Sequence, residues 1–127
     1  NAILNSFCTK SQKNGIPFSV NADTLENTAI SDMDFVAVLS NLLENAVNGC
    51  IECKSNGEIN VNIRTVADKT VIECSNPCKS DISIENNMIK NRGIGIASML
   101  SAIRKYDGNI KYSLDNGILT VCVILNS

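Results

Sequence analysis

The 127-residue sequence predicts a single α+β domain, a two-layer sandwich in which three helices cover one face of a mixed sheet of about five strands. Three segments carry apolar residues at three- and four-residue spacing, which is typical of amphipathic helices. Four shorter segments alternate or are partly apolar, and a fifth is almost continuously apolar, as expected of strands. Along the chain these segments follow one another as helix, strand, helix, hairpin, loop, helix and hairpin.

The N-terminal half contributes two helices with a strand between them. A first helix is expected from about Ala2 to Lys13, because Asn14-Gly15 ends its pattern. Residues 16–20 then alternate as a short strand. The second helix follows Ser31-Asp32, which can cap it. Its apolar face has helical spacing and consists of Phe35, Leu39, Leu42, Leu43, Ala46 and Cys50.

A hairpin and a long loop come next. Residues 59–63 alternate, the pattern breaks near Asp68-Lys69, and residues 71–74 continue as a second half-buried strand. The segment from Pro77 to Asn91 shows no long period and is the longest candidate loop. A loop of that size in a compact domain often serves as a lid over a binding site.

The C-terminal part is expected to form a third helix and a second hairpin. The helix runs from Gly93 to about Tyr106, and Asp107-Gly108 ends it. Residues 110–114 alternate, Asp115-Asn116-Gly117 makes a turn, and residues 118–125 form a nearly unbroken apolar strand.

Composition excludes some classes of function and favours a fragment of a larger protein. The net charge is −2 and no basic run is present, so electrostatics give no support for binding nucleic acid. No apolar run reaches membrane-spanning length, and no signal peptide opens the sequence. Because the sequence begins without Met, we expect residues 1–127 to be one domain excised from a longer, membrane-bound chain.

Six cysteines raise the alternatives of a zinc site or disulfides. Cys50 lies on the apolar face of the second predicted helix, and Cys122 lies inside the apolar last strand. Buried free thiols are common in such places, whereas zinc sites usually pair ligands from tight turns. The pattern favours free thiols and a reducing, cytoplasmic setting.

A row of asparagines marks the second predicted helix. Asn41, Asn45 and Asn48 stand at positions i, i+4 and i+7, on the side away from the apolar face. Asn is a poor helix former, so a surface row would more commonly be Glu, Lys, Gln or Ala. Carboxamides offer neutral oxygens and N–H donors together, which suits hydrated Mg²⁺ beside phosphates. The alternative is chance, because 18 of the 127 residues are Asn.

A second candidate feature opens the third predicted helix at Arg92-Gly93-Ile94-Gly95-Ile96. Two glycines allow a ligand to approach the backbone closely, and the free N–H groups of a first helical turn attract anions. Arg92 and the preceding Lys90 could add positive charge toward phosphate oxygens. The alternative is a plain turn with glycine at a helix start.

Two further polar residues stand at strand positions. Asn76 could accept a hydrogen bond from an adenine amino group, although an Asn-Pro pair that begins a loop is the simpler reading. Thr120 lies among Ile, Leu and Val, where its hydroxyl needs a partner. A backbone carbonyl would serve, and so would a water of a buried nucleotide site.

These motifs together resemble a known superfamily. Asn-Leu-Leu-Glu-Asn-Ala at 41–46 resembles the N box of the GHKL, or Bergerat-fold, ATPases, which include gyrase, MutL and the histidine kinases. Residues 92–96 resemble its second glycine box, and Asn76 stands where an adenine-reading Asp is usual. The order of motifs covers most of the chain, up to the hairpin at 117–120. The short lid and the Asn look most similar to catalytic domains of peptide-sensing, quorum-type sensor histidine kinases.

The resemblance implies roles for particular residues. Asn45 would be the Mg²⁺ ligand, with Asn41 as a partner on the phosphate side and Asn48 near the phosphates. Gly93 and Gly95 would shape the far hinge of the lid. Asn41 and Asn45 would be the catalytic residues, and the implied contacts to ATP are Asn41, Asn45, Asn48, Asn76, Lys90, Arg92, Gly93, Ile94, Gly95 and Thr120.

The implied activity is transfer of the γ-phosphoryl group of Mg·ATP to a histidine outside this chain, which contains none. Partners would be the dimerising histidine-bearing helices of a homodimeric, membrane-bound protein, then a response regulator, with this domain in the cytoplasm. Two alternatives remain. One is a free-standing serine kinase of the anti-sigma type. The other is a binding module that kept the fold and lost nucleotide affinity, because the usual Asp-x-Gly-x-Gly is absent at residues 75–78.

Overall fold

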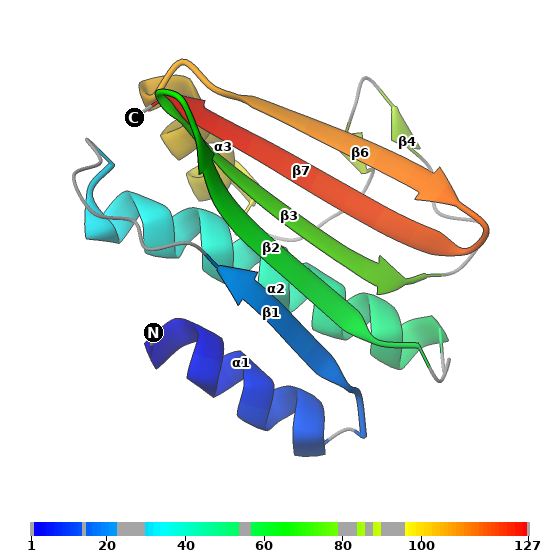
Figure 1. Ribbon diagram of the computed structural model, residues 1–127. Helices are drawn as coiled ribbons and strands as arrows, with labels where there is room; N and C mark the ends of the chain where they lie inside the picture. Colours follow the sequence, from blue (N-terminus) through cyan, green and yellow to red (C-terminus); the bar gives the residue numbers. More distant parts are fainter. Residues whose placement is uncertain are drawn as a thin grey trace.

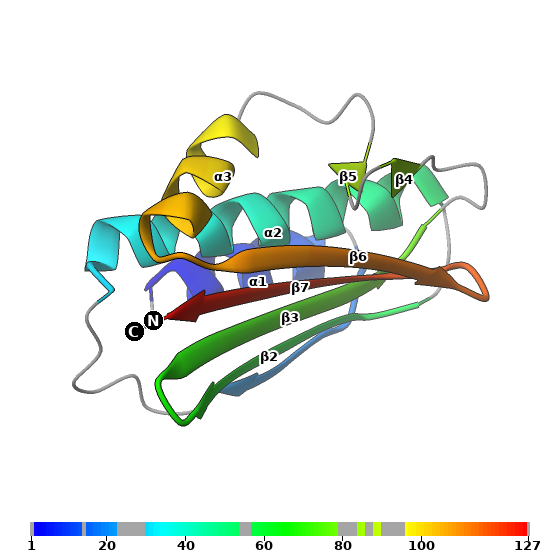
Figure 2. The same cartoon turned by 90° about the horizontal axis from the view of Figure 1, so that it is seen from above.

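The computed structural model describes residues 2–13, 15–22, 30–53, 57–78, 84–85, 88–89 and 96–126. Helices α1 (Ala2–Lys13), α2 (Asp32–Cys53) and α3 (Ile96–Lys105) lie on the same face of a five-stranded sheet, as Figures 1 and 2 show. The α+β sandwich predicted from the sequence is confirmed. None of the helices in these residues is both long and apolar enough to cross a bilayer.

The five-stranded sheet is mixed and has the spatial order β1-β2-β3-β7-β6. Its strands are β1 (Phe18–Ala22), β2 (Ile59–Val66), β3 (Lys69–Pro77), β6 (Asn109–Asp115) and β7 (Ile118–Asn126). Strand β1 pairs with β2 in parallel, and the other three pairs are antiparallel. The chain therefore places β3 at the centre of the sheet and β1 and β6 at its edges (Figure 1).

Strand register assigns each residue of the sheet to one of its two faces. On the central pair, Cys74 lies opposite Val121 and Asn76 lies opposite Leu119. These residues belong to the helix-covered face, since the Cys74 thiol lies 4.0 Å from the carbonyl oxygen of Leu42 in α2. The intervening residues of β7 are exposed or half-buried. The predicted unbroken apolar strand thus buries only alternate residues, because none of the described helices covers its second face (Figure 2).

Helix α2 provides the largest part of the core above this sheet. Its buried residues include the predicted Leu39, Leu42, Leu43, Ala46 and Cys50, and also Val38, Val47 and Gly49. Phe35 is partly buried against the same core. The buried face is wider than a simple apolar stripe because α2 packs on the sheet and on α3 at once.

Helix α3 is shorter than predicted within the described residues. It begins at Ile96, and the predicted start at Gly93 lies outside them. Met99 and Ile103 are buried, as the spacing predicts, and Ala102 is buried with them. The predicted loop from Pro77 to Asn91 contains two short strands, β4 (Ile84–Glu85) and β5 (Met88–Ile89), which pair with each other. Long apolar periods were absent there because each strand has only two residues.

Tight turns close both hairpins and the end of α3. Asn116 and Gly117 have φ values of 51° and 76° in the turn between β6 and β7. An Asn-Gly pair with positive φ at both positions is the preferred two-residue hairpin connection. The predicted turn at residues 115–117 is therefore confirmed, with Asp115 paired to Ile118.

Candidate functional site

The three asparagines of α2 lie along the border of its buried face. Asn41, Asn45 and Asn48 are all half-buried, whereas Glu44 is exposed to solvent. The predicted position on the side away from the core is therefore wrong in detail. The row borders the core because α3 packs on one side of α2 and widens the covered surface. A half-buried row of carboxamides can contact a ligand while remaining reachable from solvent.

One residue of the row is held by its own helix. The side-chain nitrogen of Asn41 donates a hydrogen bond of 2.6 Å to the carbonyl oxygen of Ala37, one turn earlier. That bond engages one of the two N–H groups of the amide. The side-chain oxygen and the second N–H therefore remain as the groups that Asn41 can offer to a ligand beside α2.

Asn76 lies where the row ends. It is 3% exposed, on the helix-covered face of β3, directly beneath Gly49 of α2. A Cβ atom on Gly49 would come within 2.5 Å of the Asn76 side-chain nitrogen. Gly49 stands one helical turn after Asn45, so Asn76 lies one turn along α2 from the proposed metal ligand. The structure thus brings Asn45 and Asn76 to the same end of α2.

Thr120 is separated from this group. Its neighbours across the strands are Ser75 and Ser113, and the adjoining Leu119 and Val121 are the buried residues. Thr120 therefore belongs to the face of the sheet that the described helices leave open, whereas Asn76 belongs to the covered face. The arrangement does not bring Thr120 together with Asn76, because a shift of one residue along a strand reverses the face, and its contact with a nucleotide stays a prediction.

The remaining predicted contacts lie outside the described residues. They are Lys90, Arg92, Gly93, Ile94 and Gly95. The described structure resumes at Ile96, the first residue of α3. In Figure 2 that end of α3 lies over the middle of α2, on the same side of the sheet as the asparagine row.

Buried thiols surround the Asn76 end of the site. All six cysteines are free, and Cys50, Cys74 and Cys78 are buried. Burial raises the pKa of Cys50 to about 11, with smaller contributions from the nearby Cys53 and Cys78. Burial likewise raises the pKa of Cys74 to about 12. The Cys50 and Cys74 thiols therefore stay protonated near neutral pH and act as small apolar residues rather than as nucleophiles.

A polar cluster that the sequence did not indicate joins the start of α2 to the end of α3. The Oδ2 atom of Asp34 accepts hydrogen bonds from Tyr106 Oη (2.6 Å), Lys105 Nζ (2.9 Å) and Ser31 Oγ (2.9 Å). These donors, Tyr106 first, lower the pKa of Asp34 to about 2. The Asp34 amide also donates to Ser31 Oγ, which is the helix cap that Ser31 was expected to provide.

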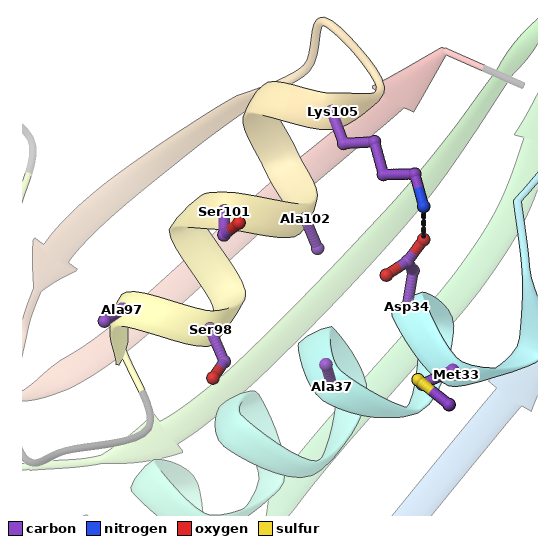
Figure 3. A pocket seen from close by; sticks show the side chains of 8 residues that line it. All are labelled: Met33, Asp34, Ala37, Ala97, Ser98, Ser101, Ala102 and Lys105. Atoms are coloured by element: carbon purple, nitrogen blue, oxygen red, sulfur yellow. Dashed lines mark hydrogen bonds and ion pairs between the residues drawn. The ribbon is translucent and has the colours of Figure 1, made fainter.

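Beside this cluster an open groove of about 490 Å³ separates α2 from α3 (Figure 3). Most of the side chains that line it are those of Ala or Ser. The lining residues are Met33, Asp34, Ala37, Ala97, Ser98, Ser101, Ala102 and Lys105. Among the residues that the structure describes, none of the predicted site residues lines this groove. Its lining on α2 reaches Ala37, one turn before Asn41, so the groove adjoins the asparagine row. Only the sequence pattern Ser-x-x-Asp at residues 31–34, a capping signal, pointed to this region.

The donor set of the row fits Mg²⁺ held mainly by water and phosphate. Within the described residues no group of three or more His, Cys, Asp or Glu side chains could hold a metal ion. Mg²⁺ commonly keeps several waters and takes only one or two protein ligands beside substrate phosphates. The half-buried Asn45 can supply one neutral oxygen of that kind, and Gly49 and Asn76 form a close-packed base beside it.

Comparison with known families adds to this geometry. The family model of the GHKL domain matches residues 30–126, which include α2, α3 and all strands from β2 to β7. The chain belongs to the GHKL domain family. The match contains both the asparagine row and Asn76. A comparison with curated proteins finds no match.

Solved structures share the fold of this GHKL domain. The nucleotide-free catalytic domain of histidine kinase ThkA is 16% identical with a TM-score of 0.76, and the match covers 99% of this chain and 92% of that chain. The Acinetobacter baumannii histidine kinase AdeS is also 16% identical with a TM-score of 0.77, over 98% of this chain and 61% of that chain.

A third example is the histidine kinase domain from the Erythrobacter litoralis EL346 blue-light activated histidine kinase. It is 10% identical with a TM-score of 0.78, over 97% of this chain and 57% of that chain. The TM-scores demonstrate a shared fold, and at identities this low they demonstrate the fold alone. The chain is therefore a GHKL domain with the fold of histidine kinase catalytic domains.

Proposed function

We propose that this GHKL domain binds Mg·ATP and transfers its γ-phosphoryl group to a histidine on a separate segment. The proposal rests on one observation: the half-buried asparagine row and the buried Asn76 lie close together at the same end of α2. A carboxamide row suits phosphates and hydrated Mg²⁺, and a single buried carboxamide suits a nucleobase edge. The shared fold with histidine kinase domains supports the choice of acceptor.

Each residue of the row has a chemical task in this proposal. Asn45 holds Mg²⁺ through its side-chain oxygen, and bound Mg²⁺ neutralises phosphate charge. Asn41 donates one N–H to the carbonyl oxygen of Ala37, so its second N–H can donate to a phosphate oxygen and its oxygen can accept from a Mg²⁺-bound water. Asn48 lies near the phosphates as a neutral donor. Phosphoryl transfer mainly requires positioning and charge neutralisation, which these side chains and the start of α3 can provide.

The row lacks a group that would activate water. In hydrolysing members of the superfamily a Glu occupies the place of Asn41, one turn before the metal-binding Asn. A carboxamide has no proton-accepting pKa near neutrality, so Asn41 cannot act as a general base. The neighbouring Glu44 is exposed and lies off the row. We therefore expect slow ATP hydrolysis and transfer only to a presented acceptor.

The acceptor and the setting follow from the same proposal. The chain has no histidine, so the phosphorylated residue belongs to another segment, which we propose to be a dimerising helical region of a longer protein. Residues 1–127 would then be the catalytic domain of a membrane-bound, homodimeric receptor with its kinase part in the cytoplasm. A response regulator would receive the phosphoryl group afterwards.

Calorimetric titration with a nonhydrolysable ATP analogue tests nucleotide binding. The domain should bind the analogue in the presence of Mg²⁺, and chelation of the metal should weaken binding strongly. Absence of binding at millimolar analogue would favour the alternative of a binding module that kept the fold and lost nucleotide affinity.

A labelling experiment with γ-labelled ATP tests the second alternative. Acid-stable labelling of a Ser or Thr acceptor would favour the serine kinase.

A further inference from the structure

Gly49 lies where α2 packs closely against the central strand β3. A Cβ atom at this position would come 2.5 Å from the Asn76 side-chain nitrogen, 3.6 Å from its Cγ and 3.6 Å from the Pro77 carbonyl oxygen. Helix interiors favour Ala over Gly, so a glycine here has a conformational cost. The absence of a side chain is explained by the space that Asn76 occupies.

The Asn76 side chain is fixed by one bond directly under Gly49. Its nitrogen donates a 2.8 Å hydrogen bond to the Pro77 carbonyl oxygen. Both the donor and the acceptor of this bond therefore lie within reach of any Cβ at position 49. The bond engages the nitrogen of the carboxamide and leaves the oxygen as the atom that can accept from a ligand.

We propose that Gly49 determines nucleobase selectivity by keeping the Asn76 carboxamide in this orientation. The proposal rests on the function proposed above, in which Asn76 reads the base. With the nitrogen held by Pro77, the oxygen faces the base and accepts from the exocyclic amino group of adenine. Guanine presents a carbonyl oxygen at the corresponding position, which the Asn76 oxygen repels. Gly49 is thus a positioning residue that acts through Asn76.

The variant Gly49→Ala tests this directly. The added methyl group should displace the Asn76 nitrogen from Pro77 and allow the carboxamide to rotate, so that nitrogen as well as oxygen can face the base. The preference for the ATP analogue over the GTP analogue should fall roughly three- to tenfold, the size of one neutral hydrogen bond. The side-chain amide signals of Asn76 in an NMR spectrum should shift even without nucleotide.

The control is Ser40→Ala, on the same helix and outside the proposed site. It also introduces alanine into α2, and it should leave both the base preference and the Asn76 signals unchanged. The double variant Gly49→Ala with Asn76→Ala provides the stability control. When Asn76 is truncated, the added methyl group should no longer lower the melting temperature and should raise it through better helix propensity.

Each outcome decides the point. Unchanged Asn76 signals and unchanged selectivity in Gly49→Ala would overturn the inference, and so would a double variant as unstable as Gly49→Ala alone. If Gly49→Ala does not fold, restored folding in the double variant supports the contact, and failure to restore it overturns the contact. A parent that binds neither analogue would overturn the proposed function, whereas the NMR and melting experiments would still test the Gly49 contact.

Discussion

At the scale of residues, the proposed site consists of a few polar side chains that lie at the border of the core beneath α2. Asn45 shares its helix with buried leucines, yet it stays half-buried and reachable. Asn76 is almost wholly buried and is held by a single bond to the backbone of Pro77. The two side chains therefore differ in what their loss would do to stability.

Replacement of Asn45 by Ala should leave the fold intact and abolish Mg²⁺-dependent binding of an ATP analogue. The side chain lies outside the buried apolar face, and alanine is a better helix former. Circular dichroism and titration with and without Mg²⁺ provide the measurement. Asn60→Ala, an exposed asparagine on β2, is the matched control. Parental affinity in Asn45→Ala would show that the metal ligand lies elsewhere.

At the scale of elements, the end of α3 shows how a helix terminus is joined to the sheet. The amide of Gly108 donates to the carbonyl oxygen of Ile103 and that of Asp107 donates to Arg104, which is a Schellman motif. Asp107 takes the left-handed position with φ of 50°. The glycine follows it, because a Cβ on Gly108 would lie 2.1 Å from the carbonyl oxygen of Ile124 in β7.

The two positions at the end of α3 should therefore respond oppositely to substitution. Asp107→Gly should raise the free energy of unfolding by about 1 kcal/mol, because glycine adopts the left-handed conformation without steric cost. Gly108→Ala should lower it by about 2 kcal/mol or more, because the methyl group collides with the backbone of β7. Urea unfolding measures both. A neutral Gly108→Ala variant would contradict the close helix–strand approach.

The Asp34 cluster joins two helices and should make their packing depend on pH. Hydrogen bonds from Tyr106, Lys105 and Ser31 lower the pKa of Asp34 from its ordinary value of 3.8 to about 2. A lowered pKa in the folded state means that the charged form stabilises the fold above about pH 4. That contribution is lost as the pH falls toward 2.

The free energy of unfolding of the parent and Asp34→Asn, measured from pH 6 to pH 2, tests this cluster. The parent should be more stable above about pH 4, and the difference should shrink as the pH approaches 2. Tyr106→Phe should weaken the same pH dependence, because the Tyr106 hydroxyl is the largest cause of the shift. A difference that stays constant across this range would show that Asp34 is not selectively stabilised in its charged form.

At the scale of the whole molecule, the domain is a sandwich with one covered and one open face. The covered face holds α2, the asparagine row and Asn76, whereas the open face holds Thr120 and the Arg64–Glu73 ion pair. Under the proposed function a nucleotide would bind on the covered face. The chain has no histidine, so under the same proposal the acceptor must be supplied by another segment.

Radiolabelled phosphotransfer tests that requirement. With γ-labelled ATP, residues 1–127 alone should incorporate no acid-labile phosphate and should turn over ATP hardly at all. Addition of the histidine-bearing helices of the longer protein should produce acid-labile labelling on those helices. The same helices with the acceptor histidine replaced by Gln are the control. Rapid ATP turnover by the isolated domain would overturn the assignment.

Local signals in the sequence predicted all three helices, the five strands of the main sheet and the asparagine motif, but not the short strands β4 and β5. Helical spacing located α2, alternation located the strands, and Asn116-Gly117 located the last turn, since each of these signals involves residues that are close in the chain. The hypothesis that Asn45 contacts Mg·ATP also came from a local motif. Such features depend on backbone preferences and periodicity, which a short segment carries within itself.

Tertiary structure alone decided which of these residues meet. Strand register put Thr120 on the open face, and the packing of α2 on β3 put Gly49 against Asn76. Asp34 bonds with Tyr106, which is 72 positions away in the chain. Contacts between distant segments depend on how whole faces fit together, and a one-residue shift in register changes them while leaving every local pattern unaltered.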